Sequence, residues 1–231
     1  KNHPVVAFVR MCLEAGVGKT RCYFDAKRAG VAVRKQVQLA LWNYLEKREG
    51  PPPEEEIPEE ELPPERPLHL FGAGHPMMFS LVVALGCDIF DSASYALFAR
   101  NGRYMTAHGT AKLEELEYFP CNCPSCHNNT PEKTRRLLLP EREKFLASHN
   151  LHSCYSELQT VKQAIVDGRL WELVEARSRS HPALQRAFLR LLDYADDFEK
   201  ETPVNKKRGQ FVTTAESLRR PEILRHAQRL A

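Results

Sequence analysis

Four residues form a candidate metal site because their types and spacing suit a tetrahedral cation. Cys121, Cys123 and Cys126 share one short segment, and His149 follows 23 residues after the last of them. Three thiolates and one imidazole are a usual closed ligand set for structural zinc. Because the protein supplies all four ligands, no coordination position stays open for catalysis. We therefore expect one structural Zn²⁺ here, and no catalytic metal.

Two other imidazoles compete for the fourth position. His127 is adjacent to Cys126 and would be strained as a co-ligand, whereas His152 is the closer competitor. A metal-free set of buried or redox-active cysteines is the remaining alternative. Two prolines keep the cysteine segment out of regular structure, so its thiolates can converge. We expect His149 near the start of a long helix, onto which zinc would clamp the loop.

Asp91 is the second candidate for chemistry, because it directly follows an apolar segment at Cys87–Phe90 that predicts a strand. A carboxylate in this place can act as a nucleophile, bind a metal, or cap the following turn through Ser92 or Ser94. Position alone favours the cap. Asp88 is expected on the opposite face of the strand, in a structural role.

The elements around Asp91 predict a βαβ unit. Leu68–Phe71 is an apolar strand, and an apolar helix over Met77–Leu85 is bracketed by Pro76 at its first turn and Gly86 just past its end. The second strand then runs parallel to the first. Asp91 therefore belongs at the carboxyl end of a parallel strand, the edge where parallel α/β proteins place their chemistry.

Flanking segments predict further elements. Upstream, Val5–Val9 predicts a short strand and Val31–Leu45 a helix. Downstream, apolar residues from Leu151 to Ile165 recur at helical spacing and predict a helix that ends at Gly168. A second helix is predicted from Trp171 and a third from Pro182.

Seven cysteines, three of them clustered, indicate metal ligation rather than disulfides. The sequence contains no apolar run long enough to span a membrane and no signal-peptide pattern. These features predict a cytoplasmic protein without a membrane partner. The first residue is Lys, which suggests that the true start is missing.

Charge is unevenly distributed along the chain. Residues 51–67 hold seven Glu, seven Pro and one Arg, a composition typical of an extended insertion. The remaining residues carry 32 basic and 23 acidic side chains, although the net charge of the whole chain is only +3. Such a surplus favours an anionic partner such as nucleic acid. An ordinarily solvated surface explains it equally well.

Three blocks together carry a family resemblance. They are HLFGAGHPMMFSLVVALGCDIFDSASYALFARNGRYMT at His69–Thr106, the CNCPSC segment, and the pair His149-Asn150. In combination they resemble the C-terminal half of the catalytic domain of tRNA-guanine transglycosylases. The HLFGAGHP and FDSASY motifs are similar to those of the archaeal, archaeosine-forming branch of the family.

The resemblance implies a fold and a reaction. The fold is α/β, a partial (β/α)8 TIM barrel containing the last strands, with a zinc-binding subdomain and C-terminal helices. Asp91 matches the family nucleophile, which attacks the ribose and forms a covalent intermediate while guanine at position 15 of the tRNA D-arm is exchanged for preQ0. Phe71 and Gly72 match substrate-binding positions at the base, and Arg100 matches a loop near the tRNA backbone. Without the resemblance, ordinary barrel packing is favoured for Phe71, and a solvated loop is the alternative for Arg100.

On this mapping the chain divides into five regions. They are a partial barrel segment (1–50), the Pro/Glu-rich insertion (51–67), the final barrel strands with the nucleophile (68–118), the zinc-binding subdomain (119–155) and a helical C-terminal region (156–231).

Three functions remain open: the transglycosylase proper, a non-catalytic zinc-stabilised tRNA-binding subunit, and a generic zinc-stabilised nucleic-acid-binding module. A full barrel needs further strands upstream, so we expect the chain alone to be inactive or unstable without a complementing segment or chain. The resemblance also implies a homodimer.

Overall fold

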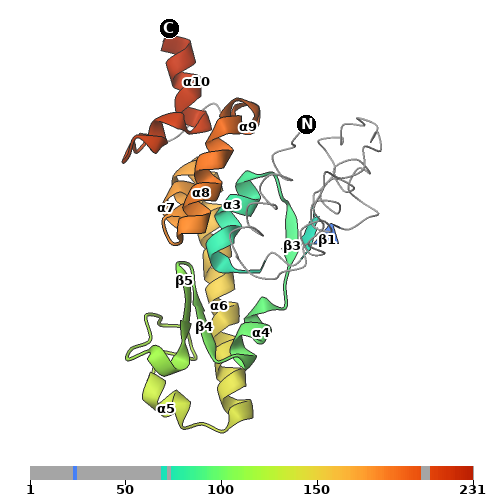
Figure 1. Cartoon of the computed structure of the whole chain (residues 1–231), viewed down its shortest axis with the longest axis vertical. Helices are drawn as coiled ribbons and strands as arrows, with labels where there is room; N and C mark the ends of the chain where they lie inside the picture. The colour runs from blue at the N-terminus through green and yellow to red at the C-terminus, as the bar shows by residue number, and fades with distance from the viewer. Residues whose placement is uncertain (1–22, 25–68, 72–73, 204–208, 231) are drawn as a thin grey trace, which may run out of the picture.

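The computed structural model describes residues 23–24, 69–71, 74–203 and 209–230 (Figure 1). The strand expected at Val5–Val9, the helix expected at Val31–Leu45 and the insertion at 51–67 lie outside the described residues. So does Gly72.

A small sheet contains the expected parallel strands. Its order is β1 (Tyr23–Phe24), β2 (His69–Phe71) and β3 (Ile89–Asp91). β2 and β3 are parallel, as the βαβ pattern predicted, whereas β1 is antiparallel to β2. Strands of a (β/α)8 barrel are all parallel. The described part of the chain therefore confirms the βαβ unit, and the partial barrel stays a prediction.

The crossover between β2 and β3 is helical, as expected. It begins with the 3-10 turn η1 (Pro76–Met78) and continues as α3 (Phe79–Ala84). The His75 side chain caps the start by accepting a hydrogen bond from the Met77 N–H, and Pro76 needs no such partner. Gly86 ends the element with φ of 85°, a left-handed conformation that disfavours other residues.

A hairpin and a long helix follow the sheet. In chain order the next elements are α4 (Ser94–Arg100), β4 (Arg103–Thr106), β5 (Gly109–Lys112), η2 (Leu113–Glu115), α5 (Pro131–Arg135) and α6 (Leu139–Val166). Figure 1 shows α6 running along the molecule, with α4 and the β4–β5 hairpin beside its first half.

Helix α6 differs from the expectation at its start. It begins at Leu139, well before His149, with Pro140 in its first turn. The expectation that His149 lies near the helix start is therefore wrong, whereas the predicted end at Gly168, with φ of 66°, is confirmed. The helix also runs without a break through residue 155, so the zinc-binding and C-terminal regions share it.

The remaining helices follow α6 toward the C-terminus (Figure 1). They are α7 (Leu170–Ser178), α8 (Pro182–Leu191), η3 (Leu192–Tyr194), α9 (Ala195–Glu201), η4 (Glu216–Arg219) and α10 (Pro221–Leu230). Of these, α7 packs directly against α6. The helices predicted from Trp171 and Pro182 are thus present. None of the helices in the described ranges is long and apolar enough to cross a membrane.

Two hydrophobic clusters hold these elements together. The larger joins β2, η1 and α3 to α7 and α8, and includes Leu70, Val82, Val174 and Phe188. The smaller joins α4, β4 and the cysteine loop to α6, through Ala99, Tyr104, Leu113, Cys126 and Leu146. The strand that ends in Asp91 and the cysteine loop are therefore supported by different cores.

The C-terminal segment docks through a buried charge pair. Glu175 of α7 is 3% exposed and accepts hydrogen bonds from Ser217 at 2.8 Å and from Arg220 at 3.2 Å. Burial would raise the pKa of Glu175, but hydrogen bonds from Ser217 and Thr214 and the charge of Arg220 together lower it. Folding thus favours the ionised carboxylate.

Candidate functional site

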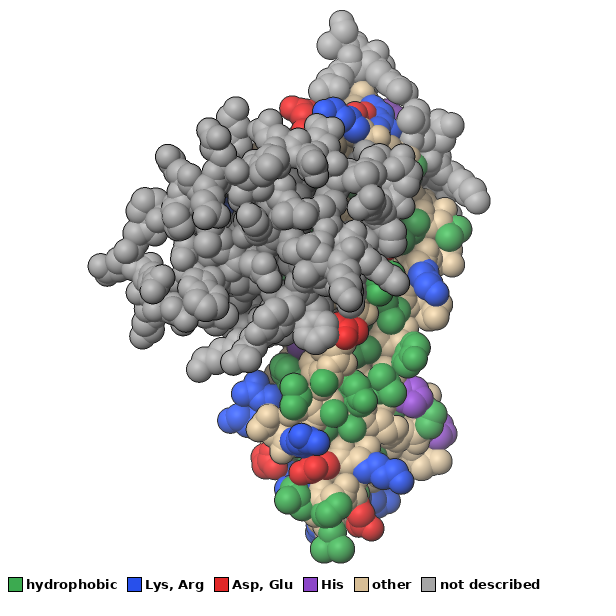
Figure 2. Space-filling view, turned by 90° about the vertical axis from the view of Figure 1, so that its right-hand side faces the viewer, with side chains coloured by type: hydrophobic (Ala, Val, Ile, Leu, Met, Phe, Trp, Pro, Cys, Tyr) green, Lys and Arg blue, Asp and Glu red, His purple; other side chains and the backbone are tan. Residues whose placement is uncertain are grey.

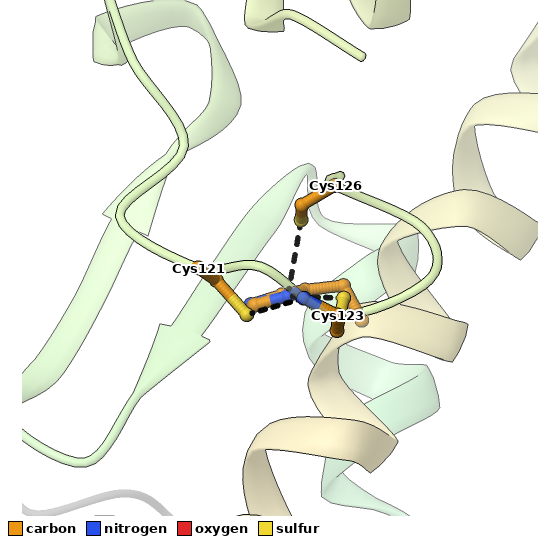
Figure 3. A group of neighbouring side chains, drawn as sticks. Cys121, Cys123 and Cys126 are labelled. Carbon is orange, nitrogen blue, oxygen red and sulfur yellow. Dashed lines mark hydrogen bonds between the residues drawn. The ribbon is translucent and has the colours of Figure 1, made fainter. Parts of the chain in front are cut away.

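The cysteine loop and α6 bring the four predicted metal ligands together. Cys121, Cys123 and Cys126 come from the irregular segment before α5, and Figure 3 shows them turned toward a common point. Their sulfur atoms and a ring nitrogen of His149 all lie within 4.8 Å of one another. The sequence had predicted this set of four.

The distances within this cluster fit a tetrahedral cation. The Nδ1 atom of His149 is 3.6 Å from Cys123 Sγ and 3.5 Å from Cys126 Sγ. Zinc bonds of about 2.3 Å to sulfur and about 2.0 Å to nitrogen, at a tetrahedral angle, separate those two atoms by about 3.5 Å. These two distances already match such an ion, and the ligand atoms that lie up to 4.8 Å apart would draw together around it.

The His149 ring is held in the orientation that a metal ligand needs. Its Nε2 atom lies 2.9 Å from the carbonyl oxygen of Met105, to which Nε2–H donates, and the ring stacks on Tyr104 with 3.6 Å between centroids. Burial lowers the pKa of His149 to about 4, so the imidazole is neutral at pH 7. The Nδ1 lone pair consequently faces the three thiols. A carbonyl that fixes the second ring nitrogen is a common support for a metal-binding histidine.

The competing imidazoles lie outside this cluster. His127 is exposed and its Nδ1 lies 2.6 Å from Asn122 Oδ1. His152 is also exposed, with Nδ1 2.9 Å from the Ser148 carbonyl oxygen. Among the described residues, His149 is the histidine of the cluster.

The thiols favour a metal over a metal-free role. Burial raises the pKa of Cys126 to about 12, and this side chain is 3% exposed. A thiol in that environment stays protonated and unreactive until a cation stabilises the thiolate. Four converging protein ligands leave no open position, which is the arrangement of a structural site.

Asp91 occupies the strand end that the sequence assigned to it. It is the last residue of β3, it is exposed, and its Cα pairs with that of Phe71 at the end of β2. The two residues predicted at the reacting sugar and the base are therefore neighbours on the carboxyl edge of the parallel pair.

The turn after Asp91 packs against the loop that follows β2. Ser92 Oγ accepts a hydrogen bond from the Ser94 N–H at 2.9 Å, and Ser94 Oγ donates to the Gly74 carbonyl at 2.7 Å. A Cβ atom at Gly74 would lie 1.9 Å from the Ser92 Cβ, so only glycine fits here. Capping of this turn was one of the roles expected for Asp91. The side chains of Ser92 and Ser94 make the hydrogen bonds given above, and so help to hold the turn.

Comparison with known proteins decides the family. A family model described as queuine tRNA-ribosyltransferase matches residues 56–183, more than half of the 231 residues. The chain belongs to this queuine tRNA-ribosyltransferase family. The matched segment contains Asp91 and all four residues of the metal cluster.

Archaeal proteins are among its most similar relatives. The chain is 54% identical over 172 residues to the tRNA-guanine(15) transglycosylase of Methanococcus vannielii, a match that covers 73% of this chain and 26% of the relative. It is 54% identical over 168 residues to the protein of that name from Thermococcus kodakarensis, covering 73% and 29%. For that of Haloarcula marismortui the identity is 53% over 164 residues, covering 71% and 33%. The chain thus spans about a quarter to a third of the length of these relatives.

One residue of the family motif has a structural part that sequence analysis missed. Asn150, fully buried beside His149, accepts from the Met105 N–H at 2.9 Å and donates to the carbonyls of Tyr95 at 3.0 Å and Arg103 at 3.1 Å. It joins α6 to α4 and β4, the elements between Asp91 and the metal cluster. The only sequence feature that could have indicated this role is the position of Asn150 directly after the candidate ligand His149.

Arg100, the residue predicted to contact tRNA, lies in the last turn of α4 and is exposed. Its charge lies at the carboxyl end of the helix, where it interacts favourably with the helix dipole. A phosphate contact stays a prediction.

Proposed function

We propose that this chain supplies the nucleophile and the zinc-stabilised region of a tRNA-guanine transglycosylase. The observation that carries the proposal is the position of Asp91, at the carboxyl end of a parallel strand within a segment that matches the family. The names of the archaeal relatives add tRNA guanine at position 15 as the substrate.

The proposed reaction has two displacements at one carbon. The Asp91 carboxylate attacks the anomeric carbon of the ribose, the bond from that carbon to guanine breaks, and a covalent glycosyl-enzyme forms. The incoming base, preQ0 in archaeosine biosynthesis, then forms its bond to the same carbon and releases Asp91. The incoming base loses one proton overall and the departing guanine gains one. Two inversions retain the configuration of the sugar.

We assign the other predicted site residues to metal binding and to substrate binding. One structural Zn²⁺ would be held by Cys121, Cys123, Cys126 and His149, where it would cross-link the loop to α6. Phe71 would stack on the base, Gly72 would line the same pocket, and Arg100 would contact the tRNA backbone. Cys121, Cys123, Cys126 and Cys154 form no disulfide, in keeping with a cytoplasmic protein.

A second candidate is a non-catalytic, zinc-stabilised tRNA-binding subunit. The observations that favour it are the four-residue metal cluster and the surplus of basic side chains outside residues 51–67. In either case we propose that the other strands of a barrel, supplied in cis or in trans, are needed for activity.

Self-association is a further part of the proposal. Large hydrophobic side chains are exposed on α4 and α6, among them Leu97, Leu151 and Tyr155. Figure 2 shows hydrophobic side chains gathered on the lower half of one face, interspersed with basic ones. An exposed apolar patch of this kind is typical of an interface. Sedimentation velocity across a concentration series tests this, and a monomer at every concentration would contradict it.

Guanine exchange distinguishes the two functions. Zinc-loaded chain, alone and with the N-terminal part of the Thermococcus kodakarensis relative as a complementing chain, is incubated with tRNA and labelled guanine. We expect incorporation only in the complemented reaction, with loss in Asp91→Asn and no loss in Asp88→Asn, a matched control three residues earlier. Tight tRNA binding without any incorporation would support the subunit instead. Exchange by the chain alone at a normal rate would show that complementation is unnecessary.

A further inference from the structure

The Gly74-His75 dipeptide lies between the Asp91 turn and the β4–β5 hairpin. On one side, the Gly74 carbonyl accepts the hydroxyl of Ser94, and Gly74 packs so closely on Ser92 that no side chain fits. On the other side, His75 reaches the hairpin, which lies outside the βαβ unit. The dipeptide is thus in contact with two parts of the fold that have separate hydrophobic cores.

The His75 ring uses both of its nitrogen atoms. Nδ1 accepts a hydrogen bond from the Met77 N–H at 3.3 Å, so the ring proton belongs on Nε2. Nε2–H then donates to Thr110 Oγ1 of β5, at 2.9 Å. The ring edge also contacts Phe98 of α4, with 5.7 Å between centroids. Burial lowers the pKa of His75 to about 4, which keeps the ring neutral with one donor and one acceptor.

The hairpin is in turn fixed to the metal cluster. Met105 of β4 accepts the hydrogen bond of His149 through its carbonyl oxygen and donates its N–H to Asn150. β4 and β5 pair directly, with Met105 opposite Thr110. The contacts therefore form an unbroken series from the metal-binding histidine, across the hairpin, to His75 and the turn after Asp91.

We propose that His75 is a positioning residue for the nucleophile: it anchors the loop after β2 to the hairpin, and that loop holds the turn that carries Asp91. The proposal rests on the proposed function for its catalytic consequence and on the contacts above for the anchoring itself. If His75 has this role, the structural metal also supports activity indirectly, because the metal cluster fixes the hairpin to which His75 is hydrogen-bonded.

The test uses two variants that remove the same contact from opposite ends. His75→Phe keeps an aromatic ring beside Phe98 but loses both hydrogen bonds, and Thr110→Val removes only the hydroxyl of an exposed residue. Thr160→Val is the matched control, since its exposed hydroxyl bonds only to the Ser156 carbonyl of its own helix.

The first measurement is hydrogen–deuterium exchange in the zinc-loaded chain alone, which needs no activity. Both variants should speed exchange in the peptide covering residues 91–98 about fivefold, with unchanged metal content. The control should match the parent. Unchanged exchange in that peptide in both variants would overturn the anchoring, whether or not the protein proves to be a transglycosylase.

The second measurement is guanine exchange with the complementing chain. Each variant should lower kcat about tenfold while the KM for tRNA stays within about twofold, and the double variant should be no slower than His75→Phe. A raised KM with an unchanged kcat, or fully additive losses, would overturn the positioning role. A parent that shows no exchange would refute the proposed function, and the first measurement alone would then decide the anchoring.

Discussion

Loss of Cys126 should remove the metal and loosen one defined part of the molecule. Cys126 Sγ lies 3.5 Å from His149 Nδ1, and a serine oxygen in its place is a much poorer zinc ligand than a thiolate. The cysteine loop between η2 and α5 contains no helix or strand and packs on a small hydrophobic cluster. We therefore expect zinc to supply most of the order in this loop.

The size of the effect follows from linkage. When free zinc exceeds its dissociation constant a thousandfold, binding stabilises the folded state by about 4 kcal/mol. Cys126→Ser should lose about that amount, together with a smaller packing loss at a side chain that is 3% exposed. Amide exchange should accelerate in residues 118–129 and change little in α7 and α8, which belong to the other hydrophobic cluster.

Metal analysis after desalting is the direct assay, with Cys154→Ser as the control. Cys154 is a half-buried thiol on α6 outside the cluster. We expect about one zinc per chain in the parent and in Cys154→Ser, and close to none in Cys126→Ser. Cobalt substitution should give the absorption of a tetrahedral thiolate site in the first two proteins only. If Cys126→Ser kept a full equivalent of zinc with unchanged affinity, the assigned ligand set would be refuted.

Three further changes test other contacts. Glu175→Gln removes one of the two buried carboxylates beside Arg220, the other being Glu222, and should cost about 2 kcal/mol in urea unfolding at pH 7. Because the folded-state pKa of Glu175 is lowered, its contribution is present above the ordinary pKa of 4.5 and is lost as pH falls through the folded-state value. The difference between parent and variant should therefore shrink as the pH is lowered below 4.5, and a pH-independent difference would contradict the assignment. Gly74→Ala should lower the melting temperature in thermal unfolding by several degrees, because the new Cβ would overlap Ser92, and an unchanged melting temperature would argue against the packing. Asn150→Ala removes one buried and two part-buried hydrogen bonds to the backbone and should cost about 2 kcal/mol in the same urea assay, while a cost below about 0.5 kcal/mol would mean that water replaces the amide.

Sequence reasoning succeeded where the signal is local. The three cysteines lie within one short segment, and zinc chemistry restricts which residue types can complete the set. The βαβ unit was equally accessible, because Pro76 and Gly86 mark the limits of the crossover helix and strand β3 ends at Asp91.

It failed where a contact joins distant parts of the chain. Asn150 bonds to residues far away in sequence, and nothing in the composition of α6 indicates those partners. The start of α6 at Leu139 was also missed, since Glu141, Arg142 and their charged neighbours show no apolar periodicity there. The same limitation applies to His75, whose partner Thr110 is brought close only by the packing of the hairpin.

The role of Asp91 as nucleophile is tested most directly by locating the covalent intermediate on the protein. The complemented reaction with tRNA is stopped by denaturation, digested with nuclease and protease, and the peptides are sequenced by mass spectrometry. We expect a ribosyl adduct on Asp91 in the parent and none in Asp91→Asn. An adduct on a different residue, or full guanine exchange by Asp91→Asn, would contradict this role.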